Sequence, residues 1–185
     1  MEEAFLLADK VGRHHINQHT ADLTLHPPES YFFVQDFLIL SCALLYTLCY
    51  LFYIARTFSD RYCAGTPLYL AGNLAYELYY ALVMPRSALE RVGFLVWFAC
   101  DISFAAVVLW RGHRVGQRGR LARQLVATTL AGMAVLKACG RYWPDDMETV
   151  VAFWSGMLLE LPIGWGSIYL LLQRKDTRGQ SLEIW

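Results

Sequence analysis

The chain has 185 residues, of which 56% are hydrophobic and only 17% charged, and its formal net charge at pH 7 is zero. So few charged residues are too few to cover the surface of a soluble domain, and the positive mean hydropathy agrees with this. The balanced charge gives no indication of a nucleic-acid partner, and residues 1–28 lack the continuous apolar stretch of a secretory signal. We therefore expect an integral membrane protein.

Five apolar segments follow one another along the chain and predict an all-α bundle of about five membrane-spanning helices. A bilayer core of about 30 Å requires about 20 apolar residues in a helix. The short connections between the segments favour antiparallel neighbours. The predicted organisation is a polar N-terminal tail (1–30), a transmembrane bundle (31–172) with helices at 31–55, 67–84, 92–110, 121–139 and 149–172, and a C-terminal tail (173–185).

Basic residues are distributed unevenly between the two sides of the predicted bundle. The connections after the first and third segments, together with the C-terminal tail, hold twice as many lysine and arginine residues as the opposite side. Because basic residues in short loops mark the cytosolic side of a membrane protein, we predict a lumenal N-terminus and a cytosolic C-terminus.

Three acidic residues lie deep inside predicted spans: Glu77, Asp101 and Glu160. A charged group at mid-bilayer costs about 2.5–3.5 kcal/mol on insertion scales, so such residues face the bundle interior and are candidates for function. Glu77 shares a helix face with Asn73 and Tyr80. Because a low dielectric disfavours the charged form, we expect Glu77 to stay protonated and to serve as a proton donor. The alternative is a neutral carboxyl that is hydrogen-bonded across a helix interface for packing.

Asp101 and Glu160 allow the same two interpretations, packing and catalysis. Asp101 lies four residues after Trp97 and three before Phe104, so the three side chains share one helix face. Glu160 shares a face with Gly156, and small residues of this kind allow two membrane helices to approach closely.

The remaining polar motifs do not indicate a metal site or a cofactor. Asp145 and Asp146 in W-P-D-D-M-E-T do not complete the D-D-x-x-D pattern of magnesium–diphosphate binding, and we interpret them as a solvated loop. The five cysteines show neither a metal-binding spacing nor a compact disulfide framework. The sequence also lacks a P-loop and a dinucleotide fingerprint, so we expect neither a metal nor a cofactor.

Two stretches of the sequence resemble a known family. G-N-L-A-Y-E-L-Y-Y-A-L-V-M-P (72–85) is similar to the N-x-x-W-E-x-x-Y-A-x-x-x-P segment of the fungal integral-membrane terpene cyclases of the paxilline and meroterpenoid type. R-K-D-T-R-G-Q-S-L-E-I-W (174–185) is similar to their T-R-G-x-S-x-x-x-W stretch. The resemblance extends over residues 31–185. Glu77 matches the acid of the family, whereas Tyr76 replaces its tryptophan.

The resemblance implies a metal-independent cyclase of a secondary-metabolite pathway in the endoplasmic reticulum membrane. Such enzymes protonate the terminal epoxide of a farnesyl or geranylgeranyl chain on an aromatic or indole core, and carbocation cyclisation follows. The implied partners are this lipophilic substrate, membrane lipids, and the epoxidase and prenyltransferase of the same pathway. Glu77 is the expected general acid, with Asp101 and Glu160 as further catalytic candidates. The expected substrate-binding residues are Asn73, Tyr76, Tyr80, Trp97, Phe104, Trp154 and Trp165.

The family pattern is incomplete in this sequence. Family members have seven helices and a second catalytic aspartate in the last one, whereas the sequence stops at Trp185. We therefore expect a short member without the last two helices, which either has reduced activity or uses another buried acid, Asp101 or Glu160, in place of that aspartate. Two alternatives stay open: a small membrane transporter, and a non-catalytic relative of the cyclases. The proline–glutamine motifs of sugar-transporter-like folds are missing from the sequence, which argues against the transporter.

Overall fold

The computed structural model describes most of the chain. Contacts divide the chain into two compact units, Met1–Tyr46 and Thr47–Trp185. The boundary falls inside the first long helix, and the second unit holds all the other helices. The described residues are 15–16, 24–63, 66–85, 87–143 and 149–184.

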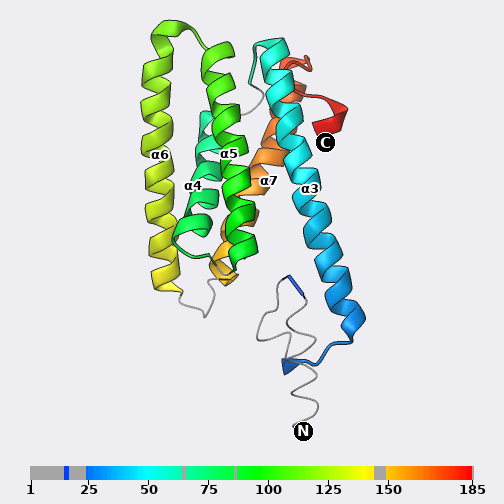
Figure 1. Ribbon diagram of the computed structural model, residues 1–185. Coiled ribbons are helices and arrows are strands. Elements are labelled where there is room, and N and C mark those ends of the chain that lie inside the picture. The colour runs from blue at the N-terminus through cyan, green and yellow to red at the C-terminus, as the bar shows by residue number, and fades with distance from the viewer. Residues whose placement is uncertain (1–14, 17–23, 64–65, 86, 144–148, 185) are drawn as a thin grey trace. The chain divides into compact units, whose positions relative to one another are not determined.

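All regular structure in these residues is helical, which confirms the predicted all-α class (Figure 1). Each predicted apolar segment coincides with one long helix of the chain. The elements are α3 (Glu29–Asp60), α4 (Pro67–Leu82), α5 (Ala88–Arg111), α6 (Val115–Tyr142), α7 (Thr149–Arg174) and the short 3-10 helix η1 (Leu182–Ile184).

The helix starts follow from their capping residues. Thr66 precedes α4 in an extended conformation, and its side chain accepts a hydrogen bond from the backbone N–H of Tyr69. Pro67 occupies the first turn, where its missing N–H costs nothing. Ser87 caps α5 in the same way by accepting from the N–H of Glu90 at 3.1 Å. These caps fix where α4 and α5 begin, and hence which residues face the neighbouring helices.

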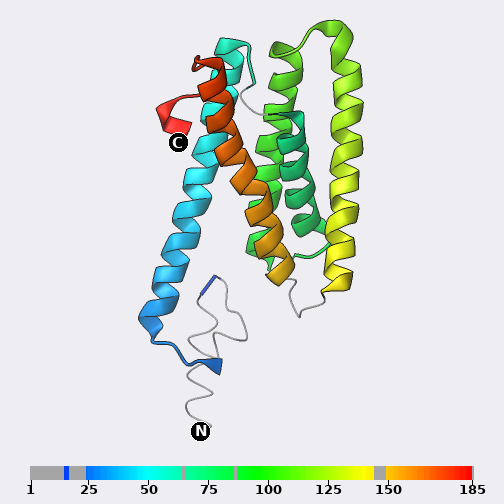
Figure 2. The same ribbon diagram turned by 180° about the vertical axis from the view of Figure 1, so that it is seen from behind.

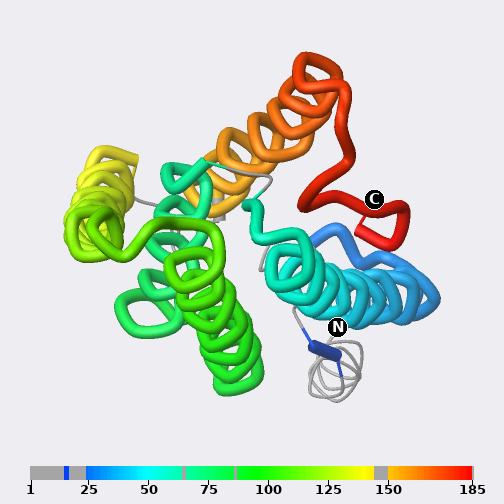
Figure 3. The backbone as a smooth tube through the Cα atoms, turned by 90° about the horizontal axis from the view of Figure 1, so that it is seen from above, coloured from blue at the N-terminus to red at the C-terminus, as the bar shows by residue number. Residues whose placement is uncertain are grey.

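Helix α4 lies at the centre of the second unit. It contacts α5, α6 and α7, and the view along the bundle shows it among these three helices (Figure 3). Half of its residues are buried. The approach to α6 is close because Gly132 has no side chain: a Cβ there would lie 2.8 Å from the Cβ of Ala75. On the side of α7, the Tyr76 hydroxyl donates a hydrogen bond to the carbonyl oxygen of Ala152 at 3.0 Å.

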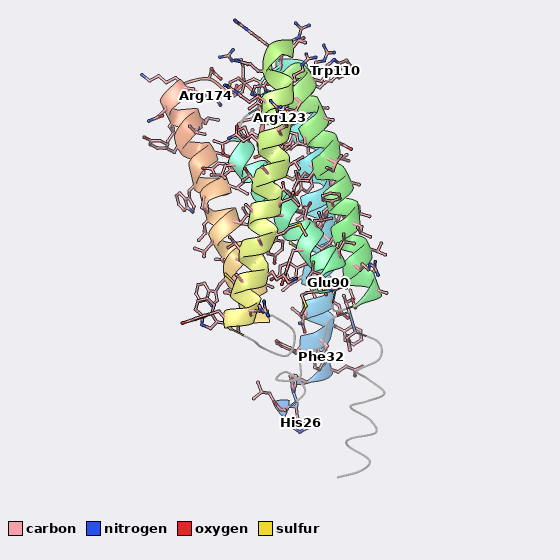
Figure 4. All side chains as sticks on the ribbon, turned by 90° about the vertical axis from the view of Figure 1, so that its left-hand side faces the viewer. His26, Phe32, Glu90, Trp110, Arg123 and Arg174 are labelled. Atoms are coloured by element: carbon pink, nitrogen blue, oxygen red, sulfur yellow. The ribbon has the colours of Figure 1, made fainter. Side chains whose placement is uncertain are left out.

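Three described helices are long and apolar enough to cross a membrane: α3, α5 and Val150–Arg174 of α7. Helix α4 has only 16 residues, and α6 carries several charged residues along its length. A complete five-span arrangement therefore stays a prediction, as does the orientation. Within the second unit, Trp110 and Arg174 lie at one end and Glu90 at the other (Figure 4).

The described contacts of the first unit join its N-terminal tail to the first turns of α3. Asp36 on α3 accepts a hydrogen bond from the backbone N–H of Ile16 at 3.0 Å. The Nδ1 atom of His15 lies 2.7 Å from the other oxygen of the same carboxylate. The His15 ring also packs on Phe32, with 5.2 Å between the ring centroids. These contacts join the described part of the N-terminal tail to the start of α3.

Candidate active site

Glu77 is a buried carboxyl in the middle of α4. Its exposed fraction is 3%, so the side chain faces the interior of the second unit. The Tyr50 hydroxyl on α3 donates a hydrogen bond to Glu77 Oε1 at 2.7 Å. Asn73, one turn before Glu77, donates its amide hydrogen to the Tyr50 oxygen at 3.5 Å. Three side chains from two helices therefore form one hydrogen-bonded chain that ends on a single oxygen of Glu77.

The second carboxyl oxygen of Glu77, Oε2, is buried without a hydrogen-bond partner of standard geometry among the described residues. Because Tyr50 donates to Oε1, the proton of a neutral Glu77 resides on Oε2. The arrangement therefore separates the two oxygens: one accepts from the protein, and the other has a proton to give.

Asp101 places a second carboxyl next to the first. It lies on α5, its exposed fraction is 0%, and neither of its oxygens has a hydrogen-bond partner of standard geometry among the described residues. Contacts of looser geometry join it to Glu77 and Tyr50. Two adjoining carboxyl groups in a low-dielectric interior do not both stay ionised. The pair therefore holds at least one proton in an otherwise apolar region.

Aromatic rings of α4 and α5, the two helices that carry this pair, pack against one another. The rings of Tyr76 and Tyr80 lie 4.6 Å apart between centroids, and Phe94 on α5 lies 5.9 Å from each. Trp97 follows at 5.5 Å from Phe94. Three of the predicted substrate-binding residues are thus brought together through a fourth ring, that of Phe94, which the sequence prediction had not included.

Phe104 and Trp97 face α3. The Phe104 ring lies 5.7 Å from the ring of Tyr53, and the indole N–H of Trp97 donates to the Thr47 hydroxyl at 3.1 Å. Both side chains are half-buried. They bring α5 against the part of α3 that also supplies Tyr50, so α3, α4 and α5 meet at the carboxyl pair.

Three predicted residues on α7 lie outside this cluster. Trp154 and Trp165 are 60% and 72% exposed, and Glu160 is also exposed, so their expected place in the bundle interior is wrong. The reason is the narrow contact of α7 with α4. Leu159 packs beside Gly72, and the next residue of a helix points about 100° away. Glu160 still exerts an electrostatic influence on groups of α3 and on the carboxyls of Glu77 and Asp101.

Tyr50 is the site residue that the sequence prediction missed. It lies in a long apolar helix, and a search for charged residues in the membrane does not select an uncharged tyrosine. Its spacing was nevertheless informative, since Tyr46, Tyr50 and Tyr53 recur at three- and four-residue intervals and so share one helix face.

A metal centre has no candidate within the described ranges, where no three His, Cys, Asp or Glu side chains are grouped to hold an ion. The sequence candidates Asp145 and Asp146 lie outside the described residues, as does Trp185 of the C-terminal motif.

A buried carboxyl pair with an aromatic lining, set in an apolar helical bundle, defines a membrane protein with an acid site. The chain matches the family model of Pyr4-like transmembrane terpene cyclases over residues 21–185, and it belongs to that family. Together with the three apolar helices, this membership makes the chain an integral membrane protein. The resemblance inferred from the two sequence motifs is thus confirmed.

Curated relatives support the same assignment. The chain is 28% identical over 180 residues to the Pyr4-family terpene cyclase mfmH of Annulohypoxylon moriforme, covering 92% of this chain and 72% of the relative. It is 30% identical over 179 residues to the terpene cyclase ausL of Emericella nidulans, covering 92% and 86%. For the terpene cyclase ascF of Acremonium egyptiacum the identity is 27% over 157 residues, covering 76% of this chain but only 57% of the relative. No solved structure is significantly similar to the chain.

Proposed function

We propose that this protein is a membrane-bound, metal-independent terpene cyclase that opens the epoxide of a prenylated substrate by protonating it. Its relatives are named terpene cyclases. The observation that supports the proposal is the pairing of two buried carboxyls, in which Glu77 Oε1 accepts from Tyr50 and Glu77 adjoins Asp101. A neutral carboxyl in an apolar site is a suitable general acid for a substrate that brings no charge of its own.

The proposed reaction is an isomerisation, so its atoms balance without a co-reactant. Glu77 Oε2 transfers its proton to the epoxide oxygen, and the C–O bond to the more substituted carbon breaks to leave a hydroxyl and a carbocation. The π electrons of the next double bond then form a C–C bond to that carbon, and further rings follow in the same way. The last cation loses a proton, which restores the proton that Glu77 gave. Asp101, which adjoins Glu77, is placed to pass that proton back.

The aromatic cluster has two roles in this proposal. The faces of Tyr76, Tyr80 and Trp97 offer negative quadrupoles to a carbocation, as they do to other cations. The cluster also contains little polar surface, and Tyr80 is only 1% exposed. A site from which water is excluded protects the cation from capture before the rings have closed.

Replacement of Glu77 by Gln tests the proposal. The amide keeps the size of the side chain and the bond from Tyr50 but has no acidic proton. We expect cyclised product from an epoxy-prenylated aromatic substrate, assayed in microsomes, to fall by about 100- to 10,000-fold, with the protein present in the membrane at its normal level. Undiminished product from the Glu77→Gln variant excludes the proposed role. Absence of product from the unsubstituted chain supports a non-catalytic relative instead.

The cellular setting belongs to the same proposal. A substrate with an aromatic head and an epoxidised prenyl chain requires a prenyltransferase and an epoxidase to act first. Their lipophilic product partitions into the membrane, and we place the protein in the endoplasmic reticulum with its basic end toward the cytosol. Protease protection of tags at the two termini in sealed microsomes tests this orientation, and a protected C-terminal tag contradicts it.

A further inference from the structure

The segment after α7 folds back against α3 and forms hydrogen bonds with it at three positions along the helix. The backbone N–H of Gly179 donates to Asp60 Oδ2 at 2.8 Å, and Gly179 has a φ of 74°, which glycine adopts without strain. The Arg56 guanidinium donates two hydrogen bonds to the carbonyl oxygen of Gln180, at 2.9 and 3.2 Å. The Cys49 thiol donates to the carbonyl oxygen of Ile184 at 3.4 Å. We call residues 176–184 the return segment; Figure 2 shows it in red beside the cyan part of α3.

The anchoring residues share one face of α3, and Tyr50 lies on the adjoining face. Cys49, Tyr53, Arg56 and Asp60 are spaced by three or four residues, and Tyr50 stands one turn from Tyr53. At a rise of 1.5 Å per residue, Tyr53 is only about 4.5 Å along the helix from the residue that donates to Glu77. The return segment therefore contacts α3 within about one helical turn of the residue that donates to Glu77.

Gln180 is the unusual residue of the return segment. Its exposed fraction is 2%, yet neither its amide nitrogen nor its amide oxygen has a hydrogen-bond partner of standard geometry among the described residues. The Tyr53 hydroxyl lies beside this amide in a contact of looser geometry. Leaving a buried donor and acceptor without partners costs about 1–3 kcal/mol each. Tyr53 contacts only part of this amide, and a ligand that pairs with the remaining polar atom removes part of the cost.

A groove of about 590 Å³ lies next to this amide. That volume is in the range of small-molecule sites, about 300–1,000 Å³. The groove has apolar walls with a few polar groups at one side, which is the composition expected for an amphiphilic ligand. It is lined by Arg56 of α3, Ile168 and Leu171 of α7, and Thr177, Gln180 and Leu182 of the return segment.

We infer that this groove binds the uncharged polar head of the substrate and that Gln180 recognises it through its unpartnered amide. The inference rests on the proposed function, which supplies the substrate class. An amide offers a donor and an acceptor, which match a ring that carries a carbonyl and a hydroxyl or N–H group. Phosphate is a poorer match, because two nitrogens of Arg56, the cation in the lining, already donate to the Gln180 carbonyl. The prenyl chain then extends past Tyr53 toward Glu77.

The first test replaces Gln180 by Met, which keeps the length of the side chain and removes both polar atoms. Two substrates with the same epoxyprenyl chain are compared, one with a carbonyl and a hydroxyl on its ring and one with neither. We expect KM for the polar substrate to rise by about 10- to 100-fold, with kcat within about twofold and KM for the apolar substrate unchanged. Equal losses for both substrates, or an unchanged KM, overturn the inference. The matched control is Gln173→Met, an exposed position on the last turn of α7 that leaves both KM values unchanged.

The second test measures binding alone and so separates this inference from the proposed function. The probe is a prenylated aromatic alkene that lacks the epoxide and carries a photoreactive group on its ring. Irradiation of membranes that contain the full chain should attach it to residues 177–182, even in a chain without turnover. Attachment elsewhere overturns the head-group site, as does displacement of the probe by phosphatidic acid vesicles. Because this test uses the unsubstituted chain, it stands even if the Gln180→Met variant fails to fold.

Discussion

Helices α4 and α7 each carry a glutamate in the middle of an apolar stretch, but the two glutamates have opposite surroundings. Glu77 on α4 is 3% exposed and receives a hydrogen bond from another helix. Glu160 on α7 is exposed, in a helix whose candidate membrane-spanning window is only 6% buried in the chain. The difference arises from the neighbours: α4 packs closely on α5 and α6, and Tyr50 of α3 reaches Glu77, whereas α7 contacts α4 along a narrow face. An acid in mid-helix becomes a site only where other helices cover it.

The largest further effect is expected at the partner of Glu77. Replacing Asp101 by Asn keeps the shape of the side chain but removes the carboxyl that adjoins Glu77. If Asp101 returns the proton to Glu77, cyclisation should fall by about 100-fold, measured as product per microsomal protein. The variant Asp101→Glu, which restores a carboxyl, should recover part of the activity. Full activity of Asp101→Asn would show that Asp101 takes no part in the proton transfer and that Glu77 acts alone.

One added methyl group tests the close packing of α4 against α6. Gly132→Ala places a Cβ against the Cβ of Ala75, an atom fixed to the backbone of α4, so the helices α4 and α6 must separate. We expect a loss of about 1–3 kcal/mol in the free energy of unfolding, seen as a lower melting temperature in detergent. Gly119→Ala in the same helix meets open space and should stabilise by up to about 1 kcal/mol. Equal melting temperatures for the two variants would contradict the close approach.

A smaller effect is expected from the hydrogen bond that orients the acid. Tyr50→Phe removes the hydroxyl that donates to Glu77 Oε1 and keeps the ring. Since such a bond contributes about 1 kcal/mol, kcat should fall by roughly five- to tenfold. Tyr142→Phe, at a position that is 75% exposed, is the control. A Tyr50→Phe variant that loses protein level but keeps kcat would assign Tyr50 to packing.

The smallest effect is expected on α7. Glu160→Gln changes an exposed side chain, and substitutions of this kind stay within about 0.5 kcal/mol, so cyclisation should remain within about twofold. The assay is the one used for Glu77→Gln, and the two variants form a matched pair of substitutions in mid-helix. A loss at Glu160 as large as that at Glu77 would show that α7 closes over the site during the reaction.

The sequence alone was sufficient to predict the long helices and to identify the two buried carboxyl residues. Apolar length located all five long helices, and the cost of a mid-bilayer charge singled out Glu77 and Asp101, which the structure buries side by side. The sequence did not indicate that Glu160, Trp154 and Trp165 lie on exposed faces of α7. A single sequence does not show which face of a helix a neighbour covers, and in a membrane an apolar side chain is as stable against lipid as against protein.

Tyr50 and Gln180 were missed for a different reason. Neither side chain is charged, so no energetic penalty in the sequence draws attention to it. Their importance depends on contacts between distant parts of the chain: Tyr50 with α4, and Gln180 with Tyr53 and the groove. Such contacts need coordinates, because helix periodicity relates residues within one helix and not between two.

The single hydrogen bond on Glu77 has a stereochemical consequence for a cyclase. With Oε1 occupied by Tyr50, the proton leaves from one atom that is held in one position by two helices. An epoxide exists in two mirror-image forms. When the prenyl chain is bound in one orientation, only one form places its epoxide oxygen within reach of the fixed proton donor. If the proposed function holds, the protein should consume one enantiomer of a racemic epoxide and leave the other in the membrane.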